Sequence, residues 1–95
     1  MKVIWSPRAF EDLLRITEII ALDKKKVAFQ WAESVRKKVL RLKKFPKSGR
    51  IVPELKREGI REIIIGNYRV IYKVDKEVAI LTVFHGAHQP KLQKI

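Results

Sequence analysis

Apolar residues recur every three or four positions in residues 7–22, and this spacing predicts an amphipathic helix. The apolar positions are Phe10, Leu13, Leu14, Ile16, Ile19 and Ile20. Ser6 and Pro7 stand at the start of the stretch. Serine caps exposed helix amides well and proline suits the first helical turn, so we expect the helix to begin here.

A second stretch with helical spacing follows a charged connection at residues 23–26. Its apolar positions are Val27, Ala28, Trp31, Ala32, Val35, Val39 and Leu42. Pro46 disfavours helical backbone at Phe45, so we expect the helix to end there. The short connection predicts that the two helices form an antiparallel hairpin.

Four stretches are predicted to be strands. Residues 2–5 form a short first strand, and residues 60–65, 68–74 and 78–84 are rich in β-branched and aromatic side chains. The last three are joined by links of hairpin length, which predicts an antiparallel meander.

Residues 47–59 contain proline and glycine and follow no period, so they are expected to form a loop. The predicted fold is a single α+β domain over residues 1–95. In it an N-terminal strand precedes an antiparallel two-helix hairpin, which packs on an antiparallel β-sheet meander (order β-α-α-β-β-β).

The composition narrows the class of protein. Hydrophobic residues make up 46% of the chain, which is ordinary for a globular protein, and there is no cysteine to form disulfides or thiolate metal sites. No apolar run approaches the roughly 18 residues of a membrane span, and the N-terminus lacks the apolar region of a signal peptide. We therefore expect a cytoplasmic protein that has no membrane partner and no cofactor.

A net charge of +12 indicates a polyanionic or acidic partner. Residues 1–50 hold fourteen basic and five acidic side chains, whereas residues 51–95 hold eight and five. Most of the excess positive charge therefore belongs to the predicted helices.

Several motifs, in this order, resemble those of the RelE/ParE toxin superfamily over essentially the whole chain. They are Trp5-Ser6-Pro7 with Asp12-Leu13 and Ile16, Phe45-Pro46-Lys47-Ser48-Gly49-Arg50 with Pro53-Glu54-Leu55, Gly59-Ile60-Arg61-Glu62-Ile63 with Asn67-Tyr68-Arg69-Val70-Ile71-Tyr72, and Ile80-Leu81 with Val83-Phe84-His85-Gly86. The resemblance implies the toxin of a type II toxin–antitoxin system, held by a cognate acidic antitoxin in a higher-order complex.

The resemblance leaves the target open. RelE-like members cut mRNA on the ribosome, and ParE-like members inhibit DNA gyrase without catalytic activity of their own. The long helices and the motif at residues 45–55 are more typical of the ParE-like branch, which favours growth arrest through gyrase. One alternative is a ribosome-dependent mRNA endonuclease. The other is a non-toxic nucleic-acid-binding or regulatory module.

Catalytic residues are expected only if the chain is a nuclease. Arg69 matches the arginine with which RelE-like nucleases contact the phosphate, and Arg61 lies near a basic position of those enzymes. His85 and His88 are candidates for acid or base, since histidine titrates near neutrality. Ile63 stands where a RelE-like mechanism would use a lysine, which weakens the nuclease interpretation. In that interpretation Arg69→Ala abolishes toxicity and leaves the fold intact.

A structural role is the alternative for each candidate. The arginines can pair with Glu54, Glu58 or Glu62, and the histidines can satisfy nearby backbone groups. If the helices cover the face of the sheet that holds the two tyrosines, Arg69 and Lys73 point into an open concave side. No third ligand accompanies the histidines, so no metal site is expected.

Four residues are candidates for binding. Arg36, Lys37 and Arg41 lie on the charged face of the second helix, and Lys73 lies on the middle strand of the meander. They would contact rRNA phosphates or an acidic antitoxin. The alternative is that they are simply solvated.

Overall fold

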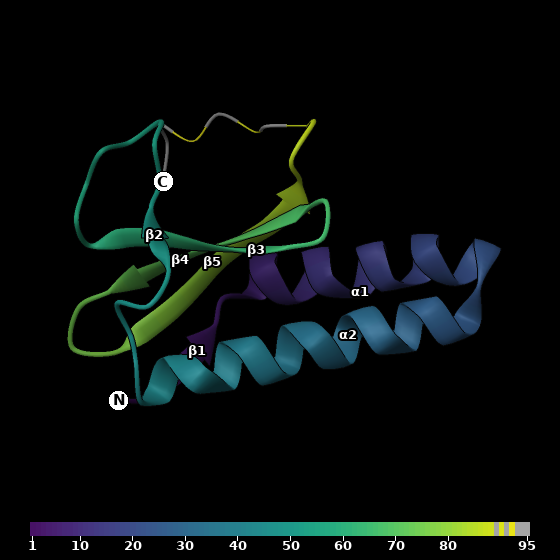
Figure 1. The fold of residues 1–95 in the computed structure, drawn as a ribbon, viewed down its shortest axis with the longest axis horizontal. Coiled ribbons are helices and arrows are strands. Elements are labelled where there is room, and N and C mark those ends of the chain that lie inside the picture. Colours follow the sequence, from purple (N-terminus) through teal and green to yellow (C-terminus); the bar gives the residue numbers. More distant parts are fainter. Residues whose placement is uncertain (89, 91, 93–95) are drawn as a thin grey trace.

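The computed structural model describes residues 1–88 together with Pro90 and Leu92. Two antiparallel helices lie against one face of a single twisted sheet (Figure 1). The elements are β1 (Val3–Trp5), α1 (Pro7–Asp23), α2 (Lys25–Leu40), a 3-10 turn (Arg41–Lys43), β2 (Arg50–Ile51), β3 (Ile60–Ile65), β4 (Tyr68–Val74) and β5 (Val78–His85). The predicted α+β layout is confirmed.

The helical hairpin is tighter than the sequence suggests. The predicted connection at residues 23–26 is wrong, because only Lys24 separates the helices, and its backbone is extended. Helix α1 begins as expected at Pro7, where the Ser6 hydroxyl accepts a hydrogen bond from the Ala9 amide at 3.0 Å. Helix α2 gives way to the 3-10 turn after Leu40, before Pro46 is reached.

The sheet has five strands in the order β1-β5-β4-β3-β2. Strands β3, β4 and β5 form the predicted antiparallel meander, whereas β1 pairs in parallel with β5. Strand β2 pairs with only two residues of β3 and lies inside the segment predicted to be a loop. A bulge in the β4–β5 pairing leaves Leu81 of β5 without an opposite residue.

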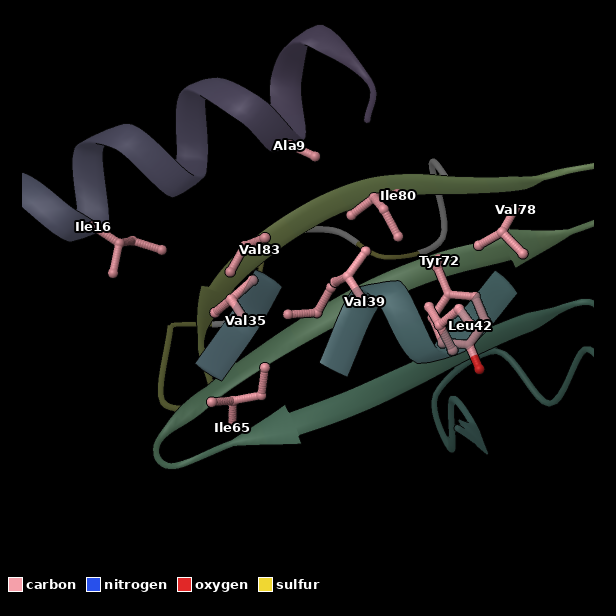
Figure 2. Packing of buried hydrophobic residues seen from close by; sticks show 11 residues of the cluster. Ala9, Ile16, Val35, Val39, Leu42, Ile65, Tyr72, Val78, Ile80 and Val83 are labelled. Carbon is pink, nitrogen blue, oxygen red and sulfur yellow. The ribbon is translucent and has the colours of Figure 1, made fainter. Parts of the chain in front are cut away.

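The main core lies between the helices and the sheet. Val35 and Val39 of α2 face strand residues such as Tyr72 and Ile80 (Figure 2). Tyr68 packs against the same cluster at its edge. The helices therefore cover the tyrosine face of β4, which was the condition for an open concave side around Arg69 and Lys73.

The opposite face of the sheet is also covered, so the expected open concave side is absent around Arg69. A second cluster on this face contains Val52, Ile60, Ile71, Phe84 and Leu92. Val52 and Leu55 come from the irregular segment between β2 and β3, which folds back over the strands. Of the expected concave pair, Arg69 is buried and only Lys73 is exposed.

Asp12 fastens α1 to the centre of the sheet. Its carboxylate is 6% exposed and accepts hydrogen bonds from the Thr82 hydroxyl at 2.7 Å and the Val83 amide at 3.0 Å. Arg15, one helical turn further along, donates to it at 2.9 Å. Both oxygens of this buried carboxylate thus accept hydrogen bonds, as a buried charge requires.

The sheet buries only part of the apolar surface of the helices. The α1–α2 hairpin extends past the strands at its turn (Figure 1). Ile19 is 56% exposed and Leu22 is 88% exposed near this turn. No described helix is long and apolar enough to cross a membrane.

Candidate functional site

An apolar groove of about 710 Å³ lies where β1, α1 and α2 meet. Its lining residues are Val3, Trp5, Phe10, Leu13, Phe29, Ala32, Glu33, Arg36, Val39, Leu40 and Lys43. Phe29 and Phe10 are 67% and 52% exposed, far more than aromatic side chains of this size usually are. A groove lined in this way suits a partner that presents apolar side chains.

Charged residues border the groove on the side of α2. Arg36 donates to Glu33 at 3.0 Å, so these two charges largely offset each other. Lys43, in the 3-10 turn after α2, has no carboxylate partner among residues 1–88. Of the expected binding residues, Arg36 therefore lies at the groove, and Lys37 and Arg41 are exposed further round α2 and the 3-10 turn.

Arg69 is the centre of a buried ion cluster on the other face of the sheet. Its guanidinium donates to both carboxylate oxygens of Glu54, at 2.8 and 2.9 Å, and its Nε donates to Glu62 at 2.6 Å. The Glu62 side chain is fully buried and also accepts from Arg50. The guanidinium lies over the Phe84 ring, 5.3 Å from the ring centroid. We call Arg50, Glu54, Glu62 and Arg69 the Arg69 cluster.

The charges of the Arg69 cluster shift one another's proton affinity. The hydrogen bonds from Arg69 lower the pKa of Glu54 to about 2, against the opposing effect of burial. The pKa of Arg69 is raised, chiefly by its hydrogen bonds to Glu54. Arg69 therefore stays charged and fully engaged, with its side chain only 8% exposed.

The low pKa of Glu54 predicts acid sensitivity. A carboxyl whose pKa falls from 4.5 when unfolded to about 2 when folded stabilises the protein above pH 4.5. That contribution disappears as the pH falls through 2. We expect Glu54→Gln to lower the free energy of unfolding by about 1–2 kcal/mol at pH 6, a value reduced for partial exposure. Urea unfolding at pH 6, 4 and 2.5 tests this, because the difference from wild type should shrink steadily. A constant difference would contradict the assignment.

Arg61 points to the opposite face from Arg69. It lies across from Tyr72 in the β3–β4 pairing, whereas Arg69 lies across from Ile64. The Arg61 guanidinium donates to the backbone carbonyls of Glu58, Lys47 and Gly49 at 3.0–3.2 Å. It therefore fixes the segment before β2. These two arginines do not converge on one site.

The two histidines lie in a third place. A hollow of about 350 Å³ near the end of β5 is lined by Arg15, Ile16, Ile19, Tyr68, Phe84, His85 and His88. The Nδ1 atom of His85 accepts a hydrogen bond from the Ala87 amide at 3.0 Å. A neutral ring that accepts at Nδ1 carries its proton on Nε2, which is then a hydrogen-bond donor. His88 packs beside it with the ring centroids 5.7 Å apart.

The four residues expected to be catalytic therefore lie in three places. Arg69 and Arg61 lie on opposite faces of the sheet, and His85 and His88 lie near the end of β5. Among the described residues no three His, Cys, Asp or Glu side chains gather in a way that could hold a metal ion. Lys73 is exposed and belongs to none of these clusters. The predicted apolar stripe of the second helix omits two of the residues that line the groove. Phe29 and Leu40 lie outside that stripe, and such off-stripe apolar residues are the sequence signal for an apolar surface there.

Comparison with known proteins identifies the family. The model of the ParE toxin of the type II toxin–antitoxin system parDE matches residues 3–90. The chain belongs to the ParE toxin family. The expected resemblance is therefore confirmed on its ParE-like side, and the chain is a toxin-family member of a toxin–antitoxin system.

The fold of this ParE family member is similar to a solved structure described as the chromosomal ParDE TA system from P. aeruginosa. The TM-score is 0.73 at 21% identity, and the match covers 90% of this chain and 95% of that chain. At this identity the likeness concerns the fold. No curated protein matches the sequence.

Proposed function

We propose that this ParE family chain is a growth-arresting toxin and that a cognate acidic antitoxin silences it by docking an amphipathic segment into the apolar groove. The exposed Phe10 and Phe29 carry the proposal, since burying aromatic surface is the largest gain open to such a partner. The net charge of +12 favours an acidic partner. Membership of a family defined by a toxin–antitoxin pair supports the same partner.

Substitution in the groove tests the antitoxin proposal. Phe29→Glu places a charge on the aromatic surface that the antitoxin would bury, so we expect the dissociation constant to rise by at least about 100-fold. Leu22→Glu is the matched control, because Leu22 is 88% exposed and lies outside the groove. Titration calorimetry with the cognate antitoxin gives both values. Equal affinities for the two variants would exclude the groove as the docking site.

We propose DNA gyrase as the target. The ParE family membership supports this, and so does the arrangement of the expected nuclease residues. Arg69 is buried in ion pairs, Arg61 holds backbone carbonyls on the other face, and His85 presents a donor. A ribonuclease needs a base, an acid and a charge stabiliser around one phosphate. The described candidates do not surround a common point.

Brief induction of the chain without its antitoxin distinguishes the targets. Gyrase-linked double-strand DNA breaks with intact messages are the expected result. New mRNA 5′ ends at defined codon positions would instead establish ribosome-dependent cleavage. Growth without arrest, for a chain shown to be folded in the cell, would favour the regulatory module.

A further inference from the structure

The outer edge of β3 is paired along only part of its length. Strand β2 pairs with only two residues of β3, Arg61 and Glu62, and its first residue, Arg50, lies opposite Glu62. The register with β4 continues as far as Ile65. Residues 63–65 therefore have a strand neighbour on one side only, among the residues that the structure describes.

The backbone of Ile64 faces this open edge. Backbone groups in an antiparallel pair alternate between pointing toward the partner strand and away from it. The Gly59 carbonyl accepts from the Val74 amide of β4, and the Ile60 carbonyl accepts from the Val52 amide on the other side. By this alternation the N–H and C=O of Ile64, four residues after Ile60, point away from β4. The Ile64 side chain is 47% exposed.

A hollow of about 400 Å³ runs along the same edge. It is lined by Lys38, Arg41, Ser48, Gly49, Arg50, Glu62, Ile63 and Ile64. Glu62 is fully buried and paired with Arg69 and with the partly exposed Arg50, so the cations of this surface that no described carboxylate offsets are Lys38 and Arg41. Neither of these two has a carboxylate partner within residues 1–88. An unpaired strand edge thus lies beside a cationic helix flank.

We infer that an acidic segment of the antitoxin in extended conformation pairs with β3 at Ile64 and adds a strand to the sheet. Unpaired strand edges attract added strands, and main-chain hydrogen bonds supply much of the affinity of such pairing. Lys38 and Arg41 select an acidic segment over a neutral one. A second copy of this chain is disfavoured, since each copy would bring the same cations to the same edge.

The inference rests on the proposed function, because the antitoxin supplies the segment. It differs from the groove proposal in place and in chemistry. The groove, lined by Phe10 and Phe29, offers apolar side-chain surface, whereas the β3 edge offers main-chain hydrogen bonds and cations. Docking in the groove and strand addition at the β3 edge can each be wrong while the other holds.

Amide hydrogen exchange measured on the complex with the cognate antitoxin tests the β3 edge directly. We expect the Ile64 amide to exchange at least about tenfold more slowly in the complex than in the free protein. Ile64→Pro removes the outward N–H and should weaken binding about tenfold, whereas Ile64→Thr keeps it and should bind nearly as wild type does. Lys38→Glu with Arg41→Glu should weaken binding more than the charge-matched Lys24→Glu with Lys25→Glu.

The outcomes separate the two proposals. A complex in which Ile64 exchanges as in the free protein, or in which the two charge-reversal pairs bind equally, would overturn the strand addition and leave the groove. Self-association of the free chain that Ile64→Pro abolishes would assign the edge to a second copy instead. Failure to form any complex would overturn both proposals. A thermal melt of each variant beforehand confirms that it is folded.

Discussion

Arg69→Met is expected to lower the free energy of unfolding by about 3–5 kcal/mol, because it leaves a buried carboxylate without its main partner. The Glu62 side chain is fully buried and would retain only Arg50, while Glu54 would lose both of its hydrogen bonds from the guanidinium. Methionine preserves most of the apolar stem, so the loss reports the charge and not a cavity. Urea unfolding at pH 7 measures it.

Lys73→Met is the control for this substitution, since Lys73 lies on the same face of the same strand and is exposed. It should change stability by less than about 0.5 kcal/mol. A similarly small change for Arg69→Met would contradict the structural role of the Arg69 cluster. The result also bears on toxicity. The burial and ion pairs of Arg69 argue against the expectation that Arg69→Ala leaves the fold intact, so a thermal melt of that variant should accompany any toxicity assay.

Asp12→Ala is expected to lower the free energy of unfolding by about 3 kcal/mol. The substitution removes the acceptor of the Thr82 hydroxyl and of the Val83 amide, and leaves that buried N–H without a partner. It also releases α1 from the sheet at mid-helix, next to the β5 bulge. Chemical denaturation at pH 7, with amide exchange at Val83, should show both the global loss and local exposure.

Glu11→Ala provides the comparison for Asp12, because Glu11 is the neighbouring carboxylate on α1 and is exposed. Its substitution should be almost neutral. Asp12→Asn should fall between the two, since the amide oxygen can still accept from one donor. If Asp12→Ala and Glu11→Ala proved equally mild, Asp12 would not hold the helix to the sheet.

The periodic parts of the fold were predictable. Both helices follow from apolar spacing, because each buries one face against the sheet, and the three meander strands follow from their β-branched and aromatic residues and the turn residues between them. The two residues of β2 were missed, since they carry no period of their own and pair only because Gly49 and Arg50 are held by Tyr72 and Glu62. The one-residue connection at Lys24 was missed for a similar reason. A lysine at this position gives no indication that a single residue joins the two helices.

The functional surfaces were less predictable than the fold. For Arg69 the sequence left two alternatives, a catalytic contact with phosphate or ion pairs with glutamates. Choosing between them required knowing that the segment between β2 and β3 folds over the sheet. Side-chain alternation alone leaves that face open. The groove depends on how the start of α1 and the second half of α2 pack beside β1, which apolar spacing within one helix does not specify. Phe29 off the stripe was the local sign of it.

The parallel pairing of β1 with β5 joins the beginning of the described chain to its last strand. During synthesis Val3–Trp5 leave the ribosome well before their partner Val78–Ile80, which follows both helices and the strands β2, β3 and β4. The groove is walled by β1, so it takes shape only once β5 has been made and has closed the sheet. A chain that lacks β5 would lack the paired β1 wall of the groove, so a partner that docks there would recognise the completed sheet.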